Sequence, residues 1–168
     1  MRAVFLGISL AALLFLLFLT SNQGYKVSGQ LNVEQKKYRD LIKDQAKALG
    51  YFNVSMLQGL ALAESSLNPL AHSKKDSYGL LQLFHAPNFS WLRWAGYKDS
   101  DINRLYDPVF NINLGISVVR YFEGRGYKFP EQSDIYNVGE TEWKKGVRNE
   151  DYRNKVILYT KEFSEGKL

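Results

Sequence analysis

The pattern of apolar positions along the chain predicts helices for most of its length. Beyond about residue 32, apolar residues recur every three to four positions, as on one face of a helix, and few segments alternate as a strand would. Asn32 before the first such segment, Gly50 after it and Asp107-Pro108 before a later one are typical helix start and stop signals. The segments predicted to be helical are 33–49, 53–67, 78–84, 88–97, 108–123, 130–136 and 149–163. We therefore expect residues 32–168 to fold as one mainly α domain.

The N-terminal segment has a different pattern, because it is apolar on every side. The stretch "MRAVFLGISLAALLFLLFLTSNQGYK" has no charged residue between its arginine and its final lysine. Its apolar part, residues 3–19, is at the short end of the roughly 17–25 residues that cross a bilayer. Residues 1–20 are therefore expected to form an apolar helix, either an uncleaved membrane anchor or a signal peptide, and residues 21–31 a linker. The absence of a clear small-residue cleavage site favours the anchor, and both alternatives place the domain outside the cytoplasm.

Composition narrows the functional classes. The chain of 168 residues is 45% hydrophobic and 14% aromatic, enough for a packed core, and it contains no cysteine. A net charge of +5 favours an anionic partner such as a nucleic acid, a membrane surface or a cell-wall polymer. The basic residues are scattered, with only short pairs and no long basic run, which argues against nucleic acid. The two histidines lack a ligand-like spacing and no carboxylate cluster accompanies them, so we expect neither a metal nor another cofactor.

One carboxylate stands out because of its neighbours. Glu64 follows the apolar stretch Leu60–Ala63, near the end of the second predicted helix. A carboxylate in apolar surroundings is either paired or kept protonated, because burial disfavours its charged form. Ser73 and Gln82 follow at intervals of nine residues, with a glycine between them. Taken alone, a glutamate near a helix end is more often a surface residue, so its importance depends on these later residues.

Four motifs in order carry a resemblance to a known family. They are Glu64-Ser65 with Asn68-Pro69 and Ser73, then Gly79-Leu80-Leu81-Gln82, then Asp107-Pro108 with Asn111-Ile112 and Gly115, and finally Tyr136-Asn137-Val138-Gly139. Over about residues 41–163, the chain resembles the soluble lytic transglycosylase (SLT) domain of the goose-type-lysozyme-like family. Leu81 stands where that pattern has methionine, Ile135 where it has alanine, and the Glu-Thr that precedes a tyrosine is missing near Tyr152.

The resemblance implies a lysozyme-like helical domain with a substrate cleft. It also implies cleavage of the β-1,4 bond between N-acetylmuramic acid (MurNAc) and N-acetylglucosamine (GlcNAc) in peptidoglycan. Most glycosidases need two carboxyl groups, but the acetamido oxygen of MurNAc can assist at its own anomeric carbon. Glu64 would then act alone as acid and base, leaving 1,6-anhydro-MurNAc ends. The residues implied to bind substrate are Ser73, Gln82, Tyr136 and Asn137, and the resemblance implies no metal.

Several alternatives stay open. Tyr136 also fits a buried aromatic, Gln82 a loop-closing amide, and Trp91 and Trp94 either core packing or stacking on sugars. A hydrolytic lysozyme with Asp76 as second carboxylate, an inactive peptidoglycan-binding module, and a structural part of a secretion apparatus or virion are the competing functions. We expect a single-pass protein of the inner membrane with its domain in the periplasm. The alternatives are secretion after signal cleavage and association with a virion.

Overall fold

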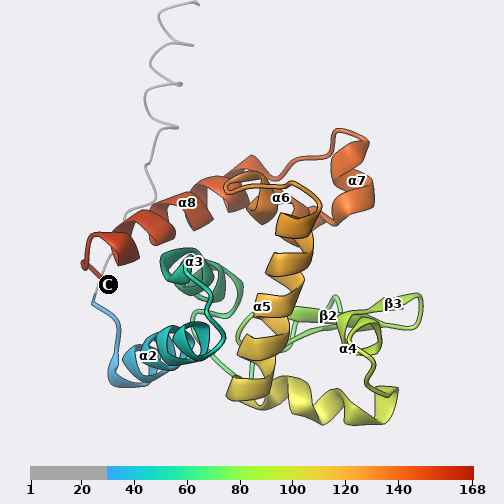
Figure 1. Cartoon of the computed structure of the whole chain (residues 1–168), viewed down its shortest axis with the longest axis horizontal. Coiled ribbons are helices and arrows are strands. Elements are labelled where there is room, and N and C mark those ends of the chain that lie inside the picture. The colour runs from blue at the N-terminus through green and yellow to red at the C-terminus, as the bar shows by residue number, and fades with distance from the viewer. Residues whose placement is uncertain (1–29) are drawn as a thin grey trace, which may run out of the picture.

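The computed structural model of the chain describes residues 30–168, so the predicted N-terminal anchor lies outside the described residues. Within residues 30–168, no helix is both long and apolar enough to span a membrane. The described part is mainly helical, as predicted, and adds three short antiparallel strands in the order β1-β2-β3 (Figure 1). Its elements are α2 (Val33–Ala48), α3 (Val54–Ser65), β1 (Ser77–Tyr78), β2 (Leu83–Ala86), β3 (Phe89–Ser90), α4 (Trp91–Trp94), the 3-10 helix η1 (Asp99–Tyr106), α5 (Pro108–Gly124), α6 (Glu131–Val138), α7 (Glu140–Lys144) and α8 (Glu150–Ser164).

The predicted helix caps are present. Asn32 accepts a hydrogen bond from the backbone N–H of Gln35, whose side chain accepts one from the N–H of Asn32, so a capping box opens α2. Asp107 accepts the N–H of Phe110 at the start of α5, where Pro108 occupies the first helical position. Asn149 accepts the N–H of Tyr152 at the start of α8. These boundaries agree with the prediction because each depends on residues close in sequence.

Helices α3 and α8 pack closely and in opposite directions (Figure 1). Gly59 of α3 faces Thr160 of α8, and a Cβ atom added to Gly59 would lie 2.6 Å from the Thr160 Oγ1 atom and 2.9 Å from its backbone nitrogen. Glycine therefore allows an approach that any larger residue would prevent. Near the other end of the contact, Glu64 in the last turn of α3 meets Tyr152 in the first turn of α8. The pairing of these two helices thus decides what surrounds Glu64.

The prediction of helices over 78–84 and 88–97 is wrong. In the first segment, residues 79–82 form a turn between the ends of β1 and β2, and in the second only Trp91–Trp94 is helical. Gly79 and Gln82 have φ angles of 76° and 45°, which a right-handed helix does not accept. The prediction also did not include η1 or α7. Tyr78, Leu80, Leu81 and Leu83 are buried, from a turn and the adjoining strand ends rather than from a helix.

A distant amide explains why segment 78–84 is not a helix. Asn111 of α5 is fully buried; its Oδ1 accepts the N–H of Leu81 at 2.8 Å, and its Nδ2 donates to the carbonyls of Tyr78 and Leu105. Two of these bonds satisfy backbone groups of the 78–84 segment in its turn conformation, and the third ties the same amide to η1. Gly115, one turn further along α5, leaves room for the Leu81 side chain. Asn111 and Gly115 thus serve the packing of the turn.

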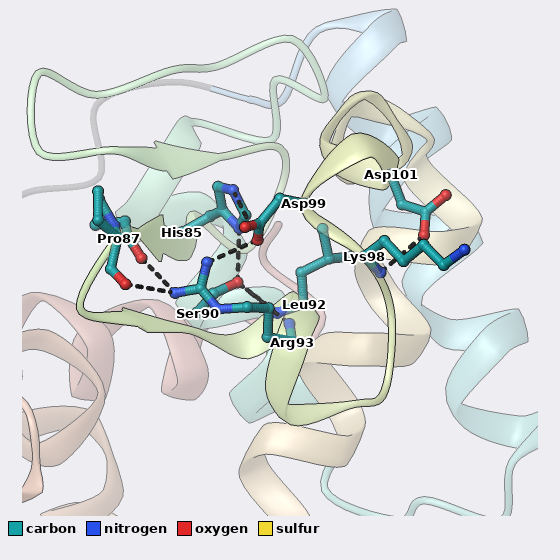
Figure 2. A network of polar contacts seen from close by, with 9 residues as sticks. His85, Pro87, Ser90, Leu92, Arg93, Lys98, Asp99 and Asp101 are labelled. Carbon is teal, nitrogen blue, oxygen red and sulfur yellow. Dashed lines mark hydrogen bonds and ion pairs between the residues drawn. The ribbon is translucent and has the colours of Figure 1, made fainter.

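A polar network holds the β2–β3 hairpin against η1 (Figure 2). Arg93 donates to Asp99 at 2.6 Å and to the carbonyl of Ala86 at 2.6 Å. Ser90 is buried, caps α4, and lies 2.6 Å from Nδ1 of His85. The His85 contact and the Arg93 contacts join neighbouring segments of this region. The network therefore fixes the hairpin, which carries several aromatic side chains discussed below.

Candidate active site

A cavity of about 710 Å³ brings the predicted site residues together. Glu64, Ser73, Gln82, Tyr136 and Asn137 all line it, although they come from α3, the following loop and turn, and α6. Aromatic side chains form another part of its wall. Their rings contact one another in stacked and edge-to-face pairs. These side chains are Phe84, Phe89, Trp91, Tyr121 and Phe122. The cavity therefore combines polar groups with an apolar surface of the kind that sugar rings contact.

Glu64 is a partly buried acid at this cavity. Its Oε1 accepts a hydrogen bond from the hydroxyl of Tyr152. Burial raises the pKa of Glu64 to about 7, although the Tyr152 hydrogen bond and the charge of Lys155 both act to lower it. Lys155 itself is held by a 3.0 Å bond from its Nζ to the carbonyl of Ala63. Near neutral pH, a substantial fraction of Glu64 therefore carries a proton that it can donate.

Tyr152 is the contact of Glu64 that the sequence analysis missed. The apolar periodicity placed it only on the buried face of the last helix. The Glu-Thr that precedes a tyrosine in the family pattern is missing here, but a tyrosine is present. That tyrosine was the signal that could have identified the contact. Burial and the nearby Glu64 raise the pKa of the Tyr152 hydroxyl well above its ordinary value, so the phenol remains a neutral donor.

The other predicted residues have defined partners. The Tyr136 hydroxyl donates to the carbonyl of Leu81 at 2.6 Å, which matches the alternative of a buried aromatic with a satisfied hydroxyl, yet the ring still lines the cavity. Gln82 donates from Nε2 to the carbonyls of Ala71 and Gly79, both at 3.0 Å, as a loop-closing amide does. Ser73 accepts the backbone N–H groups of Lys75 and Ser77, which leaves its hydroxyl proton available to another acceptor.

Two further carboxylates, Glu140 and Glu142, line the cavity, but Asp76 does not. Asp76 is exposed and is not among the cavity-lining residues. Glu140, at the start of α7, accepts a 2.8 Å bond from the Tyr127 hydroxyl and pairs with Arg125 at 2.7 Å and Lys144 at 2.8 Å. The Lys144 hydrogen bond, followed by those of Tyr127 and Arg125, lowers the pKa of Glu140 to about 2. Glu140 is therefore ionised throughout the physiological range.

The two tryptophans take different positions. Trp91 lines the cavity, whereas Trp94 does not, and it is 43% exposed. Their rings meet edge to face at a centroid distance of 5.3 Å. Of the two, only Trp91 is placed to contact a molecule in the cavity. Within the part of the chain that the structure describes, no three His, Cys, Asp or Glu side chains are grouped as metal ligands.

Fold and site together define a lysozyme-like helical domain with an acidic glutamate at its cavity. The Transglycosylase SLT domain family matches residues 41–158, and the chain belongs to this family. A relative from Haemophilus influenzae, membrane-bound lytic murein transglycosylase C, is 32% identical over 93 residues, which are 54% of this chain and 26% of the relative. The protein of that name from Mannheimia succiniciproducens is 29% identical over 93 residues, which again are 54% of this chain and 26% of the relative. The chain thus matches about a quarter of the length of these relatives.

Proposed function

We propose that this domain is a peptidoglycan lytic transglycosylase that cleaves the MurNAc–GlcNAc β-1,4 bond and leaves 1,6-anhydro-MurNAc ends. The observation that carries the proposal is Glu64, an acid with a pKa of about 7 that lines the cavity together with Ser73, Gln82, Tyr136 and Asn137. The family to which the chain belongs and the lytic murein transglycosylases that it matches support the same class of reaction. The aromatic wall offers a surface for the sugar rings.

In the first step, protonated Glu64 donates its proton to the glycosidic oxygen, and the bond between that oxygen and C1 of MurNAc breaks. The GlcNAc side leaves as an alcohol, and the MurNAc acetamido oxygen stabilises the developing charge at C1. In the second step, Glu64 as carboxylate takes the proton of the MurNAc C6 hydroxyl, whose oxygen attacks C1. The ring closes without water, and Glu64 regains the proton that it began with.

A hydrolytic lysozyme is the competing function, and Glu140 is the residue that favours it. Glu140 is an ionised carboxylate at the same cavity, as a hydrolase's second carboxyl group must be. However, its Oε1 already receives bonds from Tyr127, Arg125 and Lys144. A carboxylate with these partners is a poor base, because each partner stabilises its charged form. We therefore assign Glu140 to the binding surface of the cavity and the chemistry to Glu64 alone.

Location and partners follow from the proposed substrate. Peptidoglycan lies outside the cytoplasmic membrane, and the relatives are named as membrane-bound. We propose that residues 1–20 hold the domain at the outer face of the inner membrane, with glycan strands as its partner. Full-length protein that stays in membranes and begins at Met1 on N-terminal sequencing is the expected result. A start near Ser21 would show cleavage and release instead.

The decisive experiment is product analysis. We expect the full chain, incubated with purified peptidoglycan, to release 1,6-anhydromuropeptides, whose mass is lower than that of hydrolysis products by one water. Mass spectrometry separates the two. Products with mainly reducing-end MurNAc would show a lysozyme-type hydrolase, and an absence of any product would favour a binding module.

A further inference from the structure

Asn149 makes two side-chain hydrogen bonds with its two different atoms. Its Oδ1 accepts the backbone N–H of Tyr152 at 3.1 Å and so caps α8. Its Nδ2 donates to Oδ1 of Asn137 at 2.9 Å, and thereby joins the start of α8 to the end of α6. Asn137 and Asn149 both line the cavity. One amide therefore contacts both the helix that carries Tyr152 and a side chain exposed at the site.

The bond from Asn149 determines which atom Asn137 has left for a ligand. Because Oδ1 of Asn137 is held by Asn149, its Nδ2 group is on the other branch of the same planar amide. Among residues 30–168, this Nδ2 has no hydrogen-bond partner, and the Asn137 side chain is exposed. Asn137 is thus presented as a hydrogen-bond donor rather than as an acceptor.

We propose that Asn149 is a positioning residue, which orients Asn137 so that its NH₂ group donates to an oxygen of the bound glycan strand. This inference rests on the proposed function and adds a specificity element to it. The requirement for asparagine has a physical reason. Aspartate and serine cap a helix about as well as asparagine does, but a carboxylate has no donor, and serine has one hydroxyl oxygen where asparagine has separate accepting and donating atoms. Capping alone would not demand an amide.

Two variants separate orientation from capping. Asn149→Ser keeps a capping oxygen, but its single hydroxyl ends one bond closer to the backbone than Nδ2 did, so the restraint on Asn137 is weakened. Asn149→Asp also keeps the cap, but the carboxylate only accepts hydrogen bonds. The Asn137 amide must then turn round to donate to it, and it presents oxygen to the substrate in place of NH₂. We expect KM for soluble peptidoglycan fragments to rise about three- to tenfold in Asn149→Ser, the range of one hydrogen bond, and further in Asn149→Asp.

The controls exclude a merely structural effect. We expect kcat and the melting temperature of both variants to stay near wild type, while Asn149→Ala, which loses both bonds, also melts earlier. Asn154→Ser is the matched control, because Asn154 is exposed on the same helix and does not line the cavity, and its KM should not change. A loss of activity that simply follows the melting temperature across the Asn149 variants would overturn the proposal, as would an unchanged KM in Asn149→Asp.

A second readout does not depend on catalysis. The side-chain NH₂ signals of Asn137, identified in an ¹⁵N–¹H NMR spectrum by their absence in Asn137→Ser, should shift strongly in Asn149→Asp. Unshifted signals would overturn the orientation argument even if the wild-type protein proved inactive. Shifted signals in an inactive protein would instead refute the proposed function and leave the positioning contact in place.

Discussion

Two glutamates at the same cavity have opposite acidities, and their surroundings explain why. Glu64 lies at the junction of α3 and α8, where burial raises its pKa to about 7. Glu140 lies at the start of α7, where Lys144, Tyr127 and Arg125 lower its pKa to about 2. Glu64 receives its hydrogen bond from a neutral tyrosine, whereas two of the three partners of Glu140 are cations.

This difference shows that the position of a carboxyl group in the cavity does not by itself identify it as a proton donor. Glu64 follows apolar residues of α3, and desolvation penalises its charge more than the Tyr152 hydrogen bond and the Lys155 charge stabilise it. Glu140 belongs to the polar segment "ETEWKK", which supplies Lys144 one helical turn away. A residue that must give up a proton near neutral pH needs the first environment. A residue that holds a fixed charge at the surface needs the second.

The largest expected effect is that of Glu64→Gln. Glutamine keeps the size of the side chain but cannot donate a proton to the glycosidic oxygen or accept one from the C6 hydroxyl. General acid–base catalysis contributes roughly 10²–10⁴-fold, and one residue serves both steps here. The turnover of peptidoglycan should therefore decrease by a factor near the upper end of this range. Retention of a tenth or more of wild-type turnover would refute the assignment of Glu64.

Melting curves of the same variant at several pH values test the environment of Glu64 independently. The folded protein holds this proton up to a pH of about 7, whereas the unfolded chain releases it near 4.5. The wild type therefore loses stability as pH rises between these values, by at most about 3 kcal/mol. Glu64→Gln lacks this loss, so its melting temperature relative to wild type should increase from pH 4 to pH 8. A constant difference would contradict the raised pKa.

An intermediate effect is expected for Tyr152→Phe. The wild-type kcat/KM should fall as pH rises through about 7, because Glu64 must begin protonated. Loss of the Tyr152 hydrogen bond removes an influence that lowers the pKa of Glu64, so this fall should move to higher pH. The loss of one positioning hydrogen bond should also reduce the plateau about tenfold. A pH profile of kcat/KM for both proteins provides the measurement, and an unmoved limb would show that the tyrosine does not act on the acidity of Glu64.

The smallest effect is expected for Glu140→Gln. If Glu140 only shapes the binding surface, its neutralisation should raise KM a few-fold and leave kcat nearly intact, as partly exposed ion pairs contribute little. Asp76→Asn is the matched control, because that carboxylate is exposed outside the cavity, and its kinetics should equal those of wild type. A collapse of kcat in Glu140→Gln as deep as that in Glu64→Gln would instead establish a two-carboxylate hydrolase.

Local signals in the sequence predicted most of the helices, and the family motifs supplied the candidate site residues. Asn32, Asp107 and Asn149 cap helices as expected, because a cap involves residues only three positions apart. The five candidate residues taken from those motifs line one cavity. The helix predicted over 78–84 failed, because the burial of its apolar residues did not reveal that Asn111, some thirty positions away, pairs with its backbone.

The sequence by itself determined that this is a mainly helical domain with a glutamate in apolar surroundings, since both properties are written in neighbouring residues. Only the tertiary structure decided which groups meet that glutamate. The contact of Tyr152 with Glu64 depends on the close approach of α3 and α8 at Gly59, and the bond of Asn149 to Asn137 depends on the meeting of α6 and α8. Acidity and side-chain orientation arise from distances between segments far apart in the chain, and periodicity carries no information about those distances.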